Sequence, residues 1–191
     1  MKIVLGPPGT GKTTKLLRLV EYYLEKGVPP DKIGDLTKKD LPYFRTLHSL
    51  AFLQAGLNHT QVMKAEHYQD IADWLRVGKF YLDSSNMDQG PYKDIGYGDK
   101  YLEIINMSRI LQKPLKEIYT QSLVPLKTDW DRVSYVNRGI KHFKRAKELY
   151  DYTDMLEVFV NMNLAPKLDI VFIDEAQDLS PIQWKMVEML E

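Results

Sequence analysis

Apolar and polar residues follow strand-like and helix-like patterns at both ends of this chain. The short apolar run 2–5 predicts a strand, and helically spaced apolar residues predict a helix over 14–26 that ends at Gly27. Leu168–Ile173 is an apolar, β-branched run, typical of a strand buried in a parallel sheet. The two ends therefore indicate strands and helices of one α/β core.

The middle of the chain has a different pattern. Residues from about 58 to 150 carry helical spacing without strand–helix alternation, and a polar, glycine-containing loop over 83–99 interrupts them. The chain therefore divides into a first part of the core (1–57), a mostly helical insertion (58–150) and a second part of the core (151–191).

Composition fits a soluble enzyme module and excludes several other classes. Lys and Arg balance Asp and Glu at 26 each, so any nucleic-acid contact must come from a local basic patch. The chain has no cysteine, which excludes disulfides and thiolate metal sites, and its histidines show no zinc-ligand spacing. The sequence has no apolar run long enough for a membrane span and enters its first strand without room for a signal peptide. We therefore expect a cytoplasmic protein with no membrane partner.

Residues 6–13 match the phosphate-binding pattern G-x-x-x-x-G-K-[ST] in full, between a predicted strand and a predicted helix. In such a loop the backbone N–H groups and the helix N-terminus point at phosphate. Lys12 should reach the β- and γ-phosphates of ATP, and the Thr13 hydroxyl should bind Mg²⁺. The residues expected to bind the nucleotide are Gly6, Pro7, Pro8, Gly9, Thr10, Gly11, Lys12, Thr13 and Thr14.

Asp174 and Glu175 follow the predicted strand near the C-terminus, and Gln177 comes shortly after them. An apolar strand that delivers Asp-Glu to a sheet edge suits Mg²⁺ binding and water activation. A generic ATPase does not require Gln177, so this residue points to a more specific function. Together with the phosphate-binding loop, this segment predicts a P-loop NTPase with a parallel sheet core, using ATP and Mg²⁺.

These segments resemble the UvrD/Rep-like superfamily 1 DNA helicases. Residues 6–14 and Ile-Asp-Glu-Ala-Gln-Asp at 173–178 match ATPase motifs of that family. Arg-Thr-Leu-His-Ser-Leu-Ala at 45–51 is similar to its Thr-x-His-x-Leu motif, and Asp-Tyr-Thr-Asp-Met-Leu at 151–156 to its Asp-Phe-x-Asp-Leu-Leu segment. The insertion lies where the family has its helical 1B subdomain. The resemblance implies a RecA-like motor domain of an ATP-dependent helicase or translocase, moving 3′-to-5′ on single-stranded DNA.

The resemblance also implies roles for the residues that match. Asp174 would hold Mg²⁺ through water, Glu175 would polarise the attacking water, and Gln177 would sense the γ-phosphate. Thr46 and His48 would contact the backbone of single-stranded DNA. For these two residues a capped helix start with a buried histidine is the alternative interpretation.

A basic helix inside the insertion is a further candidate for DNA contact. Residues 129–150 have helical spacing, and Arg138, Lys141, His142 and Arg145 share one face of the predicted helix. Such a stripe could follow a phosphate backbone, but a solvated helix face is an equal alternative.

The chain also departs from the family. The interval between Ile33 and Thr46 is too short for the strand, Thr-rich motif and helix found there, so we expect an irregular junction at Gly34–Asp35. No glutamine that could read adenine precedes Gly6. A second RecA-like domain, whose arginines would reach the γ-phosphate, has no counterpart up to Glu191. We expect the chain to be the N-terminal part of a longer motor, slow in hydrolysis and unable to unwind DNA alone.

Two other function classes remain open. One is a P-loop ATPase or nucleotide kinase without nucleic-acid translocation, which would need a lid and has no obvious use for Asp-Glu-Ala-Gln-Asp. The other is a non-enzymatic docking module, against which the intact Lys12, Thr13, Asp174 and Glu175 argue. DNA-stimulated ATP hydrolysis by the parent protein would separate the helicase from the kinase, and nucleotide binding by this chain would separate both from the docking module.

Overall fold

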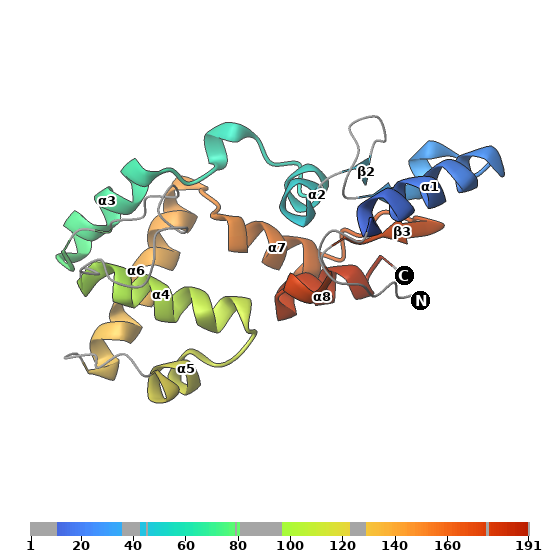
Figure 1. Ribbon diagram of the computed structural model, residues 1–191. Coiled ribbons are helices and arrows are strands. Elements are labelled where there is room, and N and C mark those ends of the chain that lie inside the picture. The colour runs from blue at the N-terminus through green and yellow to red at the C-terminus, as the bar shows by residue number, and fades with distance from the viewer. Residues whose placement is uncertain are drawn as a thin grey trace. The chain divides into compact units, whose positions relative to one another are not determined.

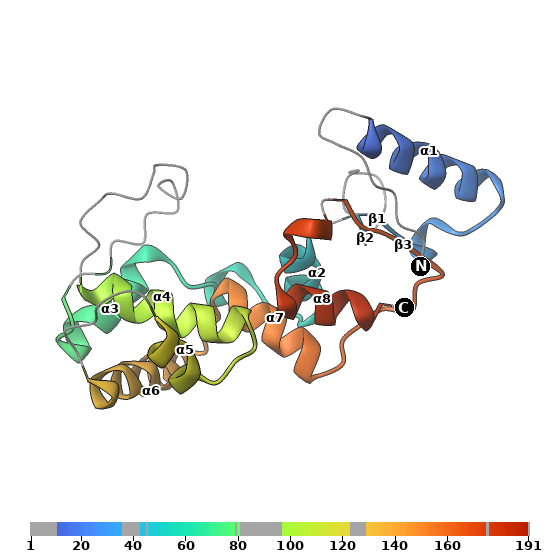
Figure 2. The same ribbon diagram turned by 60° about the horizontal axis from the view of Figure 1, so that its bottom comes forward.

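The chain forms two compact units. Unit 1 comprises Met1–Leu57 with Met155–Glu191, and unit 2 comprises Asn58–Asp154. Figures 1 and 2 show the helices and strands of each unit in a computed structural model. The residues that the structure describes are 11–35, 43–44, 46–78, 80, 97–122, 129–174 and 176–190.

The described part of unit 1 contains a small parallel sheet. Its strands are β1 (Ile33–Asp35), β2 (Tyr43–Phe44) and β3 (Ile170–Phe172), in the order β2-β1-β3. Both pairings are parallel, so β1 is hydrogen-bonded on each side. The central strand thus joins segments from the two distant ends of the chain, as an α/β core requires.

One face of this sheet is covered by α1 (Lys12–Glu25). Val20 of the helix forms one buried cluster with Ile33 of β1 and Phe172 of β3. The helix stops at Gly27, whose φ of 86° is left-handed and available to glycine at little steric cost. The helix predicted over 14–26 is therefore confirmed, with a start two residues earlier.

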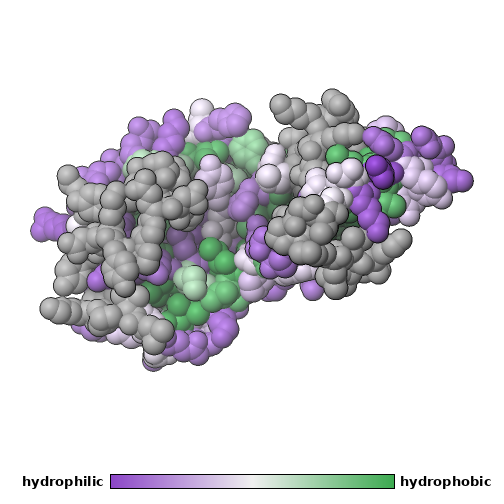
Figure 3. All heavy atoms as spheres, in the orientation of Figure 1, coloured by the Kyte–Doolittle hydropathy of each residue, from purple (hydrophilic) through white to green (hydrophobic). Residues whose placement is uncertain are grey.

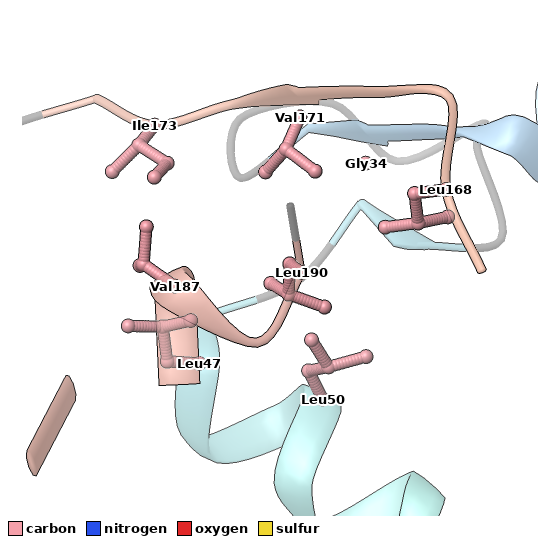
Figure 4. Close-up of a pocket in the computed structure, with 8 residues that line it drawn as sticks. All are labelled: Gly34, Leu47, Leu50, Leu168, Val171, Ile173, Val187 and Leu190. Carbon is pink, nitrogen blue, oxygen red and sulfur yellow. The ribbon is translucent and has the colours of Figure 1, made fainter. Parts of the chain in front are cut away.

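The opposite face of the sheet meets α2 (Leu47–Gln54) and α8 (Pro181–Glu188). Val171 points to this side while Phe172 points to α1, because successive strand residues alternate between faces. Figure 4 shows the apolar side chains that meet here around a cavity of about 10 Å³. Its lining is Gly34, Leu47, Leu50, Leu168, Val171, Ile173, Val187 and Leu190. Helices on both faces of a parallel sheet agree with the predicted α/β class.

Gly34 does not form the irregular junction that we expected. Gly34 and Asp35 lie in regular strand, paired in register with β2 and β3. A Cβ on Gly34 would meet Leu168 Cδ1 at 2.8 Å, so the glycine lets Leu168 pack against the strand. The segment 36–42 lies outside the described residues, as does the strand predicted over 2–5.

The described part of unit 2 is almost entirely helical. Its helices are α3 (Ala65–Leu75), α4 (Tyr97–Ile110), α5 (Leu115–Gln121) and α6 (Trp130–Lys147). They share one buried core, and Figure 3 shows hydrophobic residues gathered over α4. The largest buried members of this core include Ile71, Leu75, Tyr101, Leu102, Ile105, Val133, Val136 and Ile140. None of the helices in the described ranges is both long and apolar enough to cross a membrane.

The remaining features of the fold are the start of α4, the position of α7 and three short 3₁₀ turns. The loop predicted over 83–99 ends earlier, because Tyr97 already begins α4, and the rest of it lies outside the described residues. Helix α7 (Tyr152–Asn161) begins in unit 2 and continues in unit 1, which places the division at residue 154 rather than at 150. Short 3₁₀ turns occupy Pro30–Lys32, His59–Gln61 and Ala176–Asp178.

Candidate functional site

Gly11 begins helix α1 in a left-handed conformation, with φ 72° and ψ 26°. Helical bonding starts at once, since the N–H of Lys15 donates to the carbonyl of Gly11 at 2.9 Å. The first N–H groups of a helix lack intrahelical acceptors and carry partial positive charge, which suits an anion such as phosphate. Of the predicted nucleotide-binding residues, those outside the described ranges are Gly6, Pro7, Pro8, Gly9 and Thr10, and the side chain of Lys12 is likewise not described.

Thr13 and Asp174 are joined by a direct hydrogen bond. The Thr13 hydroxyl, in the first turn of α1, donates to Asp174 Oδ2 at 2.7 Å across 161 residues of sequence. Asp174 lies just beyond β3, and α1 packs on the same sheet through Val20 and Phe172. The sheet thus brings Thr13, the last residue of the predicted phosphate-binding motif, to Asp174.

These two oxygens suit a hard divalent cation. Hydroxyl and carboxylate oxygens are the ligands that Mg²⁺ prefers, and adjacent ligands of octahedral Mg²⁺ lie roughly 3 Å apart. The observed separation of 2.7 Å between Thr13 Oγ1 and Asp174 Oδ2 is close to that edge. Within the described ranges no cluster of three or more His, Asp or Glu side chains is placed to hold a metal ion. The remaining ligands would therefore have to be phosphate and water, as is usual for Mg²⁺.

Gln177 lies on the 3₁₀ turn that follows Asp174, close to the predicted metal ligand in sequence. Its side chain is exposed, and its Nε2 donates to Asp178 Oδ2 at 3.3 Å. Glu175, the predicted base, lies outside the described residues. Thr14 is exposed on α1 beside Thr13.

Thr46 is the N-cap of α2. Its hydroxyl accepts a hydrogen bond from the backbone N–H of Ser49 at 3.2 Å. His48, in the first turn, is half-buried rather than buried, and burial lowers the pKa of its imidazole below the ordinary value. A capped helix start is therefore present, as the alternative interpretation required. The cap uses a lone pair of Thr46 and leaves its own hydrogen able to donate.

The basic residues Arg138, Lys141 and Arg145 are exposed on α6 in unit 2. The opposite side of the helix is buried, with Val133, Val136 and Ile140 in the core. This confirms the helical spacing from which the stripe was predicted. The stripe belongs to unit 2, whereas Thr13 and Asp174 belong to unit 1.

A buried ion-pair cluster, which the sequence did not reveal, holds the start of α7. Arg109 of α4 contacts Asp151 Oδ2 at 2.8 Å and Asp154 Oδ1 at 2.6 Å. Lys144 of α6 contacts Asp151 Oδ2 at 2.7 Å and Asp154 Oδ2 at 2.6 Å. The two carboxylates also accept each other's backbone N–H, both at 2.8 Å, in the reciprocal manner of a capping box.

Burial and charge act in opposite directions on these carboxyls. Burial alone would raise the pKa of Asp151, but the charges of Arg109 and Lys144 outweigh it and hold this pKa below its ordinary value. Burial, and then the negative charge of Asp151, raise the pKa of Asp154. Burial and the same two carboxylates also raise the pKa of the nearby Tyr68.

The Asp-x-x-Asp spacing at 151–154 was the one local signal for this cluster, since it suits the first turn of a helix. In the sequence this spacing belongs to the segment that resembles the helicase family. Nothing adjacent in sequence points to Arg109 or Lys144, which come from other helices. In this structure Asp151 and Asp154 link the start of α7 to Arg109 of α4 and Lys144 of α6.

Comparisons with known proteins give one distant relative. The chain is 23% identical over 223 residues to "Putative ATP-dependent DNA helicase YjcD" of Bacillus subtilis (strain 168). The match covers 98% of this chain and 28% of that protein, so the chain spans less than a third of the relative's length. No protein-family model matches the chain. No solved structure matches it either. The similarity supports a distant helicase-like relationship and does not single out one helicase group.

Proposed function

We propose that this chain is the ATP-binding part of a UvrD/Rep-like DNA helicase or translocase with a P-loop, RecA-like core. The observation that carries the proposal is the 2.7 Å hydrogen bond from Thr13 to Asp174. It joins the last residue of the G-x-x-x-x-G-K-[ST] pattern to the first acid of Asp-Glu-Ala-Gln-Asp. The distant similarity to a protein named as a DNA helicase adds independent support.

The proposed chemistry is hydrolysis of ATP. The helix N-terminus at Gly11 and the Lys12 ammonium bind the phosphates, and Thr13 and Asp174 would hold Mg²⁺. When bound, this ion neutralises charge on the phosphate oxygens. Glu175 accepts a proton from the attacking water as the water oxygen bonds to the γ-phosphorus and the bond to the bridging oxygen of ADP breaks.

DNA enters the proposal through Thr46 and His48. The Thr46 hydroxyl can donate to a phosphate oxygen while it accepts from Ser49. The lowered pKa of His48 keeps its ring neutral near pH 7, so its contribution would be a hydrogen bond rather than a charge. Gln177, exposed on the turn after Asp174, would sense the γ-phosphate and pass its loss to the DNA-binding surface.

The whole motor is a further part of the proposal. The chain matches 28% of its helicase-named relative, so a second RecA-like domain of the same parent protein would supply arginines to the γ-phosphate. Such arginines contribute on the order of 10³–10⁵ in rate. We therefore propose slow hydrolysis and no unwinding by this chain alone, and 3′-to-5′ movement of a cytoplasmic parent protein.

Calorimetric titration with Mg²⁺·ATPγS, with and without oligo(dT), tests the proposal. The chain should bind the nucleotide, Lys12→Ala should lose this binding, and Glu175→Gln should keep it. Oligonucleotide affinity should change when the nucleotide is present. A folded chain that binds no nucleotide would overturn the proposal. Nucleotide binding without any response to DNA would favour a P-loop ATPase or nucleotide kinase.

A further inference from the structure

An exposed tryptophan lies beside the basic stripe of α6 in unit 2. Trp74, near the end of α3, is 53% exposed although it is large and apolar. Its ring stacks on the imidazole of His142, with ring centroids 5.9 Å apart and planes inclined by 30°. More than half of the side chain remains accessible for a second planar partner.

Basic residues flank this stacked pair. Arg138 and Arg145 lie one helical turn before and after His142, and Lys141 precedes it directly. All three are exposed. Arg138 donates to the hydroxyl of Ser134 at 3.3 Å. This hydroxyl is neutral, so it does not cancel the positive charge of the Arg138 guanidinium. The surface therefore presents positive charge next to an aromatic plane.

Two of the other charged groups near this surface, Lys144 and Asp70, lie close to opposite charges. Lys144 points into unit 2 and pairs with buried acids. On α3, Asp73 accepts from Gln69 at 3.0 Å, and Asp70 lies 3.9 Å from Lys147 Nζ. No acid interrupts α6 between Arg138 and Lys147. The stripe thus keeps a local positive charge in a chain that is neutral overall.

A close contact between α3 and α6 lies next to the stacked pair in sequence. Gly139 lies against Leu75, so closely that a Cβ would meet Leu75 Cδ2 at 2.5 Å. This contact brings α3 and α6 together beside Trp74 and His142, and Leu75 is itself 2% exposed in the core. A platform that is rigid before binding loses less entropy when a ligand docks.

We propose that the α3–α6 surface, defined by Trp74, Arg138, Lys141, His142 and Arg145, binds single-stranded nucleic acid. An unpaired base stacks on the Trp74 indole, and the basic residues contact the adjoining phosphates. A duplex fits this surface less well because its bases are already stacked on one another. The inference deepens the proposed DNA-dependent function by adding a binding site in unit 2, but it does not depend on nucleotide.

Fluorescence anisotropy with the full chain and no nucleotide tests this site. The probes are labelled oligo(dT) and an abasic strand with the same number of phosphates. Wild type should bind oligo(dT) more tightly, and Trp74→Ala should weaken that binding about tenfold while leaving the abasic strand unchanged. Arg138→Ala and Arg145→Ala should weaken both probes and each lower the salt dependence by about one phosphate contact.

Controls keep a folding defect from imitating the result. Trp74→Phe should restore most of the preference for oligo(dT), and Tyr135→Ala should change neither affinity. Tyr135 is a suitable control because it is an aromatic residue of α6 that is 42% exposed, and its ring lies against Arg132. Equal affinities for the two probes in wild type, or tighter binding to a hairpin duplex or polyglutamate, would overturn the inference.

The test of the α3–α6 surface can fail or succeed independently of the test of the proposed function. Oligo(dT) binding that depends on Trp74 and survives in Lys12→Ala supports the α3–α6 surface even if no nucleotide binds. If the chain binds nucleotide and its affinity for oligo(dT) is the same in wild type and Trp74→Ala, the proposed motor function is supported. The same result would overturn the proposed site on the α3–α6 surface.

Discussion

Gly139 of α6 and Leu75 of α3 approach so closely that a side chain at position 139 has no room. A Cβ there would meet Leu75 Cδ2 at 2.5 Å and Cδ1 at 2.8 Å. Glycine inside a helix costs about 0.5–1 kcal/mol relative to alanine. The contact between α3 and α6 therefore offsets a local disadvantage in helix stability.

Gly139→Ala should lower the free energy of unfolding by about 1–3 kcal/mol, because the new methyl group forces Leu75 to move. Urea denaturation measures the change. In a Leu75→Ala background the same substitution should instead stabilise by about 0.5–1 kcal/mol, since only helix propensity then remains. Destabilisation of equal size in both backgrounds would contradict the steric explanation.

Asp151→Asn should lower the free energy of unfolding by about 3 kcal/mol or more, because it leaves the buried charges of Arg109 and Lys144 short of a partner. Urea denaturation at pH 7 is the measurement. Glu117→Gln, which removes the exposed pair with Lys113, is the matched control and should have little effect. Similar losses in the two variants would argue against a special role for the buried cluster.

The same carboxyl predicts a dependence of stability on pH. The pKa of Asp151 is lower in the folded protein than in the unfolded chain, so the unfolded chain binds this proton first as pH falls. The stabilisation is complete above about pH 5 and should be lost progressively toward pH 2. The raised pKa of Asp154 opposes this trend in part. Denaturation curves across this range should be flatter for Asp151→Asn than for wild type.

Substitutions at Thr46 can separate its capping role from its proposed role in DNA binding. Thr46→Ala should cost about 1 kcal/mol of stability because Ser49 loses its acceptor. Thr46→Asp should keep the cap and the stability, but its negative charge should weaken oligo(dT) binding. Thermal denaturation and anisotropy give the two readings. Unchanged oligo(dT) affinity in a stable Thr46→Asp protein would remove Thr46 from the DNA-binding surface.

If Thr13 and Asp174 hold Mg²⁺ as proposed, replacing either residue should weaken nucleotide binding only when Mg²⁺ is present. Thr13→Ala and Asp174→Asn should each weaken binding of Mg²⁺·ATPγS about tenfold, as ligand-shell changes commonly do. Binding of ATPγS in EDTA should change little. Thr13→Ser keeps the hydroxyl and should behave like wild type. Equal losses with and without Mg²⁺ would show that the two residues act only on structure.

Local sequence patterns predicted the parts of this fold in which neighbouring residues determine the structure. Apolar spacing located α1, α6 and β3, and the Asp-Glu segment was placed correctly after a strand. The sequence assigned both Thr13 and Asp174 to Mg²⁺, and the structure joins the two side chains by a hydrogen bond. The roles of these residues in binding ATP and Mg²⁺ stay predictions.

The features that sequence did not predict depend on contacts between distant segments. Gly34 looked like a break in the chain but lies in the central strand, where it makes room for Leu168. Arg109 joins Asp151 across 42 residues, and no periodicity records such a pair. Trp74 and His142 stack where α3 and α6 approach closely at Gly139. In the sequence alone, Gly139 indicates only a residue of low helix propensity.

The split of unit 1 around unit 2 has a consequence for the order in which the protein folds. Unit 2 is one continuous stretch, Asn58–Asp154, so its internal contacts can form without the rest of the chain. The sheet of unit 1 cannot close until Ile170–Phe172 reaches Ile33–Asp35. Pairing across so long a loop is slow because closure entropy is lost before the contacts form. During synthesis unit 2 is therefore expected to form first, and Thr13 of α1 gains its partner Asp174 only when the last strand has emerged.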